Sequence, residues 1–359
     1  MVMRSLSMAL HPGRAPRAVL ERLLATLPAD LPASGPDGPV AVLERRISEL
    51  LGTEAALFLP SGTMAQQVAL RIHAERRGRW AFAAHPQSHL EVWEERGYAV
   101  VHGLRFHPVG DRHAPMDAAG LDAVAEPPAA VVWELPQRDL GGTLPEWDDL
   151  REQVRRVRAR GAAAHLDGAR IWEAQTFYER PFAEIAGLFD TTYVSLYKSL
   201  LGIRGAVLAG DAATTAQARL WRQRLGGGIA DAWPLAAAAL AGLDDVLPRM
   251  PAYRDHARAI AAAVNADGTA HTMPAVPPTP LFHVVLPLGR AAAERAAAEL
   301  AADRQVRMFS RVWTSADDRS CRFEITVGEH VMPFTPNEVT DLLRDLVRRG
   351  RRPVDPPPG

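Results

Sequence analysis

A single lysine occurs in a chain that otherwise uses arginine for nearly all of its positive charge. Lys198 is the only lysine in 359 residues, and the other 40 of the 41 basic residues are arginine. The guanidinium of arginine stays protonated, whereas a buried lysine can lose its proton and form a Schiff base with a carbonyl group. A lone lysine can also be an accident of composition. The apolar segments at 191–196 and 205–211 favour a functional lysine, because a charged amine inside a core is costly.

An acidic residue stands at a second predicted strand end. Asp167, in "HLDGAR", comes 31 residues before Lys198 and follows an apolar run. Alone, this carboxylate is as typical of a structural role, as a helix cap or in an ion pair, as of a functional one. Together with Lys198 it matches the needs of pyridoxal 5'-phosphate (PLP). This cofactor requires a lysine for its aldehyde and an acid to keep its pyridine nitrogen protonated.

The segment "LPSGTMAQQ" offers a place for the phosphate of such a cofactor. Gly62 permits close backbone approach, the amides at the start of the next helix favour an anion, and Ser61 and Thr63 add hydroxyl groups. An ordinary helix cap explains the same letters. His89, in "HLEVWEERG", could stack on a cofactor ring or act as a base, although one histidine among 12 is more often structural.

The elements that must position these residues alternate along the chain. Short apolar runs predict strands, and amphipathic segments between them predict helices. The predicted strands are 55–59, 79–84, 130–135, 162–169, 191–196 and 205–211, and the predicted helices include 39–52, 61–78 and 146–161. This alternation favours a mainly parallel sheet covered by helices, so the fold class is α/β.

The pattern changes after about residue 234. A long Ala-rich helix leads into two further strands and two further helices, which is typical of a smaller α+β domain. These strands are predicted at 281–288 and 321–327, and the helices at 291–302 and 336–350. The predicted organisation is an N-terminal arm (1–37), a large cofactor-binding domain (38–245), a small C-terminal domain (246–350) and a disordered tail (351–359).

Composition narrows the classes of function. A formal net charge of −1 argues against binding to nucleic acid or another polyanion. The one cysteine, Cys321, excludes a disulfide framework and a multi-cysteine zinc site, and it suits a reducing cytosol. The first residues make a poor signal peptide, and no apolar run is long enough to span a membrane. We therefore expect a cytoplasmic protein that binds no metal.

The quoted motifs together resemble one known family. The segments "FLPSGTMAQQVAL", "HLEVWEERG", "HLDGAR" and "YVSLYKSLLGIRGAVLAG", with Glu134 and "GGTLP" between the second and third, are similar in order and spacing to low-specificity L-threonine aldolases. These enzymes belong to the aromatic amino-acid β-eliminating lyases, a group of fold-type I PLP enzymes. The resemblance covers residues 38–240 well and the C-terminal part loosely.

The resemblance implies a role for each matching residue. Lys198 binds PLP covalently, Asp167 pairs with the pyridine nitrogen, and His89 stacks on the ring and is the candidate base. The remaining implied residues are Ser61, Gly62, Thr63, Glu134 and Arg170 around the cofactor, and Arg170, Arg322 and Gln137 around the substrate. From the sequence alone, Arg322 in "CRFEIT" could equally be a surface strand residue.

The chain also departs from the family. Gln137 stands where the aldolases carry a second active-site histidine, and Ala230 stands where an arginine often reaches the phosphate of a neighbouring subunit. The resemblance implies cleavage of a β-hydroxy-α-amino acid to glycine and an aldehyde by a homodimer or homotetramer. Because Gln137 replaces an imidazole, we expect threonine itself to be a poor substrate. The alternatives are β-elimination, racemisation or transamination on the same scaffold, or a non-catalytic relative.

Overall fold

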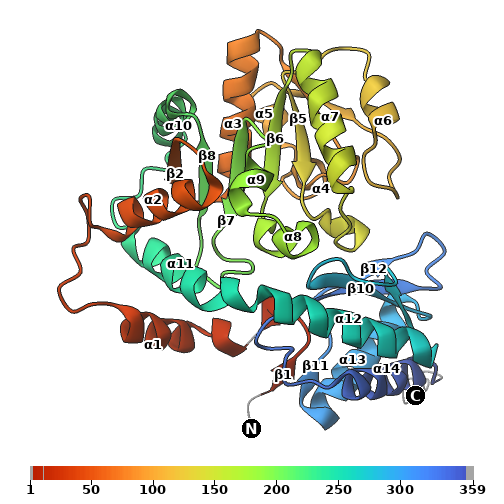
Figure 1. Ribbon diagram of the computed structural model, residues 1–359. Helices are drawn as coiled ribbons and strands as arrows, with labels where there is room; N and C mark the ends of the chain where they lie inside the picture. Colours follow the sequence, from red (N-terminus) through yellow and green to blue (C-terminus); the bar gives the residue numbers. More distant parts are fainter. Residues whose placement is uncertain (1–2, 11, 353–359) are drawn as a thin grey trace, which may run out of the picture. The chain divides into compact units, whose positions relative to one another are not determined.

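Two compact units make up the protein in the computed structural model, which describes residues 3–10 and 12–352 (Figure 1). One unit spans residues 21–248, and the other combines residues 1–20 with residues from 249 onward. The predicted N-terminal arm is thus divided between the units, and the large unit ends at 248 rather than 245. Most of the predicted disordered tail lies outside the described residues. The roles assigned to the domains stay predictions.

The large unit is built on a seven-stranded sheet with the order β2-β8-β7-β6-β5-β3-β4. Every neighbouring pair from β7 to β4 is parallel, whereas β8 runs antiparallel to both β7 and β2. The strands are β2 (Ala55–Leu59), β3 (Ala81–Ala84), β4 (Arg105–Pro108), β5 (Ala130–Glu134), β6 (Ala163–Gly168), β7 (Thr191–Ser195) and β8 (Ala206–Gly210). The predicted, mainly parallel α/β fold is confirmed.

Helices connect and cover these strands. They are α1 (Pro16–Thr26, whose first five residues are assigned to the other unit), α2 (Pro39–Leu51), α3 (Gly62–Arg77), α4 (His89–Val92), α5 (Gly97–Val100), α6 (Ala118–Asp122), α7 (Trp147–Ala159), α8 (Ile171–Tyr178), α9 (Phe182–Ala186), α10 (Ala212–Arg224) and α11 (Trp233–Val246). Residues Arg138–Leu140 form a short 3₁₀ helix. The loops from β3 to α4, from β5 to this turn and from β6 to α8 leave the sheet at one edge, because parallel strands end on the same side.

Helix α3 is central to the core of the large unit. Its apolar residues contribute to two hydrophobic clusters, one with β2, β7, β8 and α10, and one with β3, β5 and the short helices α4 and α5. The Ser61 side chain caps the helix by accepting a hydrogen bond of 3.2 Å from the Met64 amide, and Gly78 ends it in a left-handed conformation. The predicted helix over 61–78 is confirmed.

The smaller unit contains a four-stranded antiparallel sheet with the order β12-β13-β10-β9. Its elements are α12 (Met250–Asp267), β9 (His271–Met273), β10 (Leu281–Leu286), α13 (Arg290–Arg304), β11 (Val306–Arg307), β12 (Trp313–Thr314), β13 (Cys321–Thr326) and α14 (Pro336–Gly350). The N-terminal strand β1 (Arg4–Ser5) pairs with β11, and Arg4 forms an ion pair of 2.6 Å with Glu338. Residues from the N-terminal part of the chain therefore pair with residues from its C-terminal part within this unit.

Candidate active site

The carboxyl end of the parallel strands brings two acidic residues together. Glu134, the last residue of β5, is the register partner of Asp167 on β6, and Asp167 is the register partner of Tyr193 on β7. Register partners project from the same face of a sheet. The backbone thus places the three side chains in one row, with Asp167 in the middle.

Asp167 is buried, and its orientation is fixed locally. Its Oδ1 atom accepts a hydrogen bond of 3.0 Å from the amide of Ala169, two residues further on. The proximity of Asp167 contributes to raising the pKa of Tyr193 above its ordinary value, after the larger effect of burial. This places Tyr193 next to the carboxylate as a neutral hydroxyl group.

Lys198 lies three residues beyond the end of β7, in the same region. The pKa of its amine is lowered to about 8, mainly by burial and also by the nearby Arg170, while the negative charges of Asp167 and Glu134 act in the opposite direction. About half of the amine is therefore neutral near pH 8, where an ordinary lysine is almost wholly protonated. A neutral amine is the form that attacks an aldehyde.

A buried carboxylate holds the loop that carries Lys198. The Ser199 hydroxyl donates a hydrogen bond of 2.5 Å to Glu173 Oε1, and Arg170 Nε lies 3.8 Å from the same oxygen. Glu173 is almost fully buried on α8. A buried acid with a basic neighbour stays charged more readily than an isolated one. Glu173 thus links the "DGAR" segment to the lysine loop.

The turn at the start of α3 is shaped by close packing. A side chain at position 62 would collide with the hydroxyl and ring of Tyr193, so only glycine fits there. The Ser61 hydroxyl is used for the helix cap, whereas the Thr63 side chain is exposed. The helix N-terminus and the Thr63 hydroxyl are the parts of the predicted phosphate site that face solvent.

His89 begins α4, just after β3. Its Nδ1 atom lies 3.0 Å from Glu94 Oε1, and Glu94 is buried. His89 is among the neighbours that counteract the rise in the pKa of Glu134, which places His89 near the edge of the sheet where Glu134 and Asp167 lie. The structure thus brings the predicted residues Lys198, Asp167, Glu134 and His89 into one region of the large unit.

Gln137 makes contacts that its predicted role did not include. Its Nε2 atom donates hydrogen bonds of 3.2 Å to Glu134 Oε2 and of 3.2 Å to the carbonyl of Gln87, while the Arg138 amide donates to Glu134 Oε1 at 3.1 Å. Burial, with the nearby charges of Asp167 and Asp139, raises the pKa of Glu134 to about 7. Glu134 is therefore a group that can gain or lose a proton near neutral pH.

Arg322 lies in the other unit, on β13 of the four-stranded sheet. It is half-buried, and its register partners are Val285 on β10 and Trp313 on β12. Its predicted contact with a substrate carboxylate stays a prediction.

Three tryptophans flank the motif residues, and the structure separates their roles. Trp133 and Trp172 are buried, with indole N–H groups that donate to Gln153 Oε1 at 3.0 Å and to the Ser195 carbonyl at 3.4 Å. These two belong to the core. Trp93 is half-buried and donates to Asp139 Oδ2 at 2.9 Å.

Some residues of this region were not predicted from the sequence. Glu94 stands five residues after His89, and Glu173 stands three residues after Arg170. Side chains three residues apart are neighbours on the surface of a helix. That spacing is the one local signal that could have drawn attention to Glu173. The contact between Ser199 and Glu173 spans 26 positions and carries no local signal.

This chain is similar to known proteins over most of its length. A family model described as "Beta-eliminating lyase" matches residues 14–285. The chain belongs to the beta-eliminating lyase family. The low specificity L-threonine aldolase of Escherichia coli K12 is 31% identical over 261 residues, which cover 71% of this chain and 77% of that enzyme.

Two solved structures resemble this member of the beta-eliminating lyase family over nearly its whole length. The first, from Exiguobacterium sp. 255-15, bears the names aromatic amino acid beta-eliminating lyase and threonine aldolase; it is 32% identical, covers 97% of both chains and has a TM-score of 0.89. The second, named for an L-allo-threonine aldolase of Listeria monocytogenes EGD-E, is 30% identical, covers 97% of this chain and 96% of that one, and has a TM-score of 0.88.

The family is one of fold-type I enzymes that depend on PLP, and the residues present fit that cofactor. A lysine amine with a pKa of about 8, a buried carboxylate beside it and a helix N-terminus built on glycine supply the groups that an aldehyde, a pyridine nitrogen and a phosphate need. Tyr193 is the register partner of Asp167 and packs against Gly62, and the charge of Asp167 acts on the amine of Lys198.

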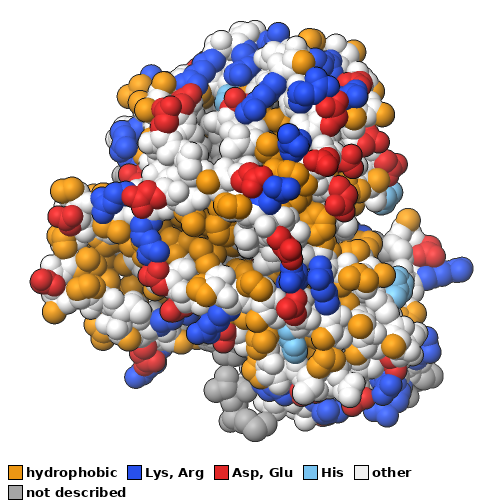
Figure 2. All heavy atoms as spheres, viewed as in Figure 1, with side chains coloured by type: hydrophobic (Ala, Val, Ile, Leu, Met, Phe, Trp, Pro, Cys, Tyr) orange, Lys and Arg blue, Asp and Glu red, His pale blue; other side chains and the backbone are white. Residues whose placement is uncertain are grey.

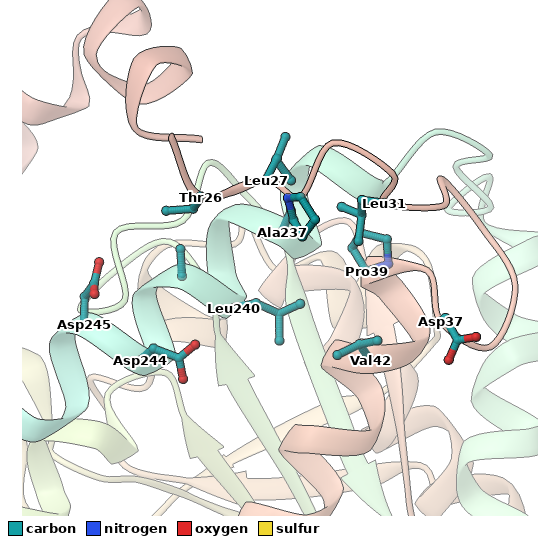
Figure 3. A pocket seen from close by; sticks show the side chains of 12 residues that line it. Thr26, Leu27, Leu31, Asp37, Pro39, Val42, Ala237, Leu240, Asp244 and Asp245 are labelled. Carbon is teal, nitrogen blue, oxygen red and sulfur yellow. The ribbon is translucent and has the colours of Figure 1, made fainter. Parts of the chain in front are cut away.

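A separate cavity of about 250 Å³ lies between α2, α11 and the segment that follows α1 (Figure 3). Apolar side chains such as Leu240 and Val42 line it, together with acidic ones such as Asp37 and Asp244. The predicted site residues are not part of its lining. This cavity is therefore distinct from the candidate active site.

Proposed function

We propose that this protein is a PLP-dependent aldehyde-lyase that cleaves a β-hydroxy-α-amino acid to glycine and an aldehyde. The observation that carries the proposal is the position of Lys198 beside Asp167, Glu134 and Arg170, where burial lowers the amine pKa to about 8. The names of its relatives, low specificity L-threonine aldolase and L-allo-threonine aldolase, support the same class of substrate.

PLP, when bound, supplies an aldehyde that reacts with amines and a protonated ring that accepts electrons from the α-carbon. In our proposal Lys198 holds the aldehyde, and Asp167 holds the proton of the ring nitrogen. The α3 N-terminus, with Gly62 and Thr63, binds the phosphate. Arg170 and Arg322 bind the substrate carboxylate through charge-assisted hydrogen bonds.

Proton transfer from the β-hydroxyl is assigned to His89. The amide of Gln137 can donate a hydrogen bond but cannot take a proton near neutral pH. The two hydrogen bonds that its Nε2 atom donates, to Glu134 Oε2 and to the Gln87 carbonyl, support a role in orienting Glu134, in addition to contact with substrate. We therefore assign the second proton-handling position to Glu134 rather than to an imidazole.

We also propose a β-substituent larger than the methyl group of threonine. Two of the three tryptophans near the motifs are core residues, which leaves Trp93 as the aromatic candidate for contact with substrate. Its indole is held by Asp139, and the guanidinium of Arg138 lies 5.5 Å from its ring centre. An aromatic side chain fixed in this way favours an apolar or aromatic substituent.

A panel of amino acids tests the proposal. The purified protein, loaded with PLP, is incubated with threonine, allo-threonine, phenylserine and serine, and the products are identified. Release of glycine with an aldehyde, faster from phenylserine than from threonine, is the expected result. Pyruvate and ammonia from serine, without aldehyde from any β-hydroxy amino acid, would replace aldol cleavage with β-elimination. That reaction is the second candidate because Gln137 removes an imidazole used by the aldolases.

We further propose a cytoplasmic homodimer or homotetramer. Hydrophobic side chains gather on the surface over α2 and α11 (Figure 2), and Leu24 of α1 is 76% exposed. Exposed apolar surface of this kind favours association. Within residues 3–10 and 12–352, no helix is long and apolar enough to cross a membrane. Sedimentation velocity of the protein at several concentrations measures its oligomeric state.

A further inference from the structure

Glu94 is a buried carboxylate with two side-chain partners. Its side chain is 1% exposed, against 29% for the His89 side chain that it contacts. His89 Nδ1 lies 3.0 Å from Glu94 Oε1, and Gln67 Nε2 donates a hydrogen bond of 3.2 Å to Glu94 Oε2. Each carboxylate oxygen therefore has its own partner, from α4 and from α3.

This arrangement decides which nitrogen of His89 carries the proton. An ionised carboxylate accepts hydrogen bonds and donates none, so the nitrogen that faces Glu94 must carry a hydrogen. In a neutral imidazole the other nitrogen then holds the lone pair. The Nδ1–H form leaves Nε2 as the proton acceptor, on the part of the ring directed away from Glu94.

The surroundings of Glu94 are built to keep this geometry. Gln67 lies on α3, the same helix whose N-terminus forms the candidate phosphate site. A side chain at Gly97 would place its Cβ atom 2.6 Å from Gln67 Nε2, so it would push this amide away from its present position beside Glu94. Partners that orient an imidazole in this way raise its basicity and fix its direction.

We propose that Glu94, backed by Gln67, is a positioning residue that holds His89 in the Nδ1–H form and presents Nε2 as the proton acceptor. The inference deepens the proposed function, because it rests on the assignment of His89 to the β-hydroxyl proton. In that step the substrate O–H bond breaks and an Nε2–H bond forms. The Nδ1–H hydrogen stays on the ring, and ionised Glu94 stabilises the resulting imidazolium.

Nitrogen NMR of the PLP-loaded protein tests the first half of the proposal. Protein labelled with ¹⁵N-histidine gives separate signals for protonated and unprotonated ring nitrogens, and His89→Gln identifies the signals of His89. We expect the Nδ1–H form in the unsubstituted protein and a mixture of both forms in Glu94→Leu. A lone pair on Nδ1 of His89 in the unsubstituted protein overturns the proposal.

Kinetics test the second half, with a neighbouring glutamate as control. Glu94→Leu should lower kcat about 10²-fold with little change in KM, and it should keep the visible absorbance of bound PLP. Glu94→Gln keeps an acceptor but has no charge, so about a tenfold loss is expected. Glu95→Leu changes an exposed side chain next in sequence and should retain full activity. Equal kcat values for Glu94→Leu and Glu95→Leu overturn the proposal.

The two readouts also separate this inference from the proposed function. If the unsubstituted protein cleaves no β-hydroxy amino acid, the proposed function fails, and the NMR result still decides whether Glu94 sets the protonated nitrogen of His89. If cleavage is observed while His89 carries its proton on Nε2, the function stands and the inference about Glu94 fails.

Discussion

The side-chain amide of Gln137 lies against the carboxylate of Glu134, with 3.2 Å between Gln137 Nε2 and Glu134 Oε2. A second hydrogen bond, to the carbonyl of Gln87, fixes the same nitrogen. Sequence reasoning assigned Gln137 to the substrate. The structure adds a function toward the protein itself, because this amide orients the acid whose pKa is raised to about 7.

Substitution of Gln137 tests whether this position limits the reaction. Gln137→His introduces a group that accepts a proton near neutral pH, and we expect threonine cleavage to rise on the order of 10²-fold. Gln137→Leu, which has neither donor nor acceptor, is the matched control and should show no gain. Steady-state rates with threonine and phenylserine provide the measurement. Rapid threonine cleavage by the unsubstituted protein, unchanged in Gln137→His, would show that position 137 does not control the chemistry.

Glu134 should make stability depend on pH. Its pKa is raised from 4.5 to about 7 in the folded protein, so the folded state holds a proton that the unfolded state has released. The corresponding stabilisation is complete below pH 4.5 and is lost as the pH rises through about 7. Urea unfolding of cofactor-free protein should therefore show a steeper loss of stability over this range than Glu134→Gln shows. Parallel curves for the two proteins would contradict the raised pKa.

Lys198 should be the one site of covalent cofactor attachment. Borohydride reduction of the PLP-loaded protein should label a single peptide that contains Lys198, and Lys198→Ala should remain colourless. Because the amine pKa is lowered to about 8, cofactor attachment should accelerate as the pH rises toward 8 and then level off. Stopped-flow absorbance from pH 6 upward follows this rate. PLP that stays covalently bound to Lys198→Ala after reduction and dialysis would place the attachment elsewhere.

Substitution of Arg322 should weaken amino-acid binding without affecting the attachment of PLP at Lys198. Arg322→Lys keeps the charge but removes the planar pair of donors that binds a carboxylate. Amino-acid binding should weaken tenfold or more, about 1.4 kcal/mol, while the absorbance of bound PLP is unchanged. Spectroscopic titration with glycine measures the affinity. Unchanged affinity would remove Arg322 from the substrate site.

Loss of Glu173 should destabilise the region around Lys198. Glu173→Ala removes the acceptor of the Ser199 hydroxyl and a buried negative charge 3.8 Å from Arg170. We expect the free energy of unfolding to fall by about 3 kcal/mol. Glu184→Ala removes one half of an exposed ion pair with Arg180 and should cost about 0.5 kcal/mol. Chemical denaturation compares the two. Equal decreases in the free energy of unfolding would show that the buried Glu173 contributes no more to stability than the exposed Glu184.

Local sequence patterns were sufficient to predict the core strands of the large unit. The predicted strands at 55–59 and 191–196 correspond to β2 and β7, because uninterrupted apolar runs are typical of strands buried on both faces. The strand β4 was missed since "RFHP" is short and half of its residues are polar. The long Ala-rich helix was predicted as one element, whereas residues Leu247–Arg249 separate α11 from α12.

The sequence by itself determined that Lys198 and Asp167 lie at strand ends, and parallel strands place such ends along one edge of a sheet. Only the tertiary structure decided which side chains meet there. The contacts of Glu94 with Gln67, of Ser199 with Glu173 and of Gln137 with the Gln87 carbonyl join segments far apart in the chain and depend on how those segments pack against one another. The pKa values of Lys198 and Glu134 depend on burial together with the charges nearby. Distances and desolvation of this kind arise from packing in three dimensions, which the order of residues along the chain does not specify locally.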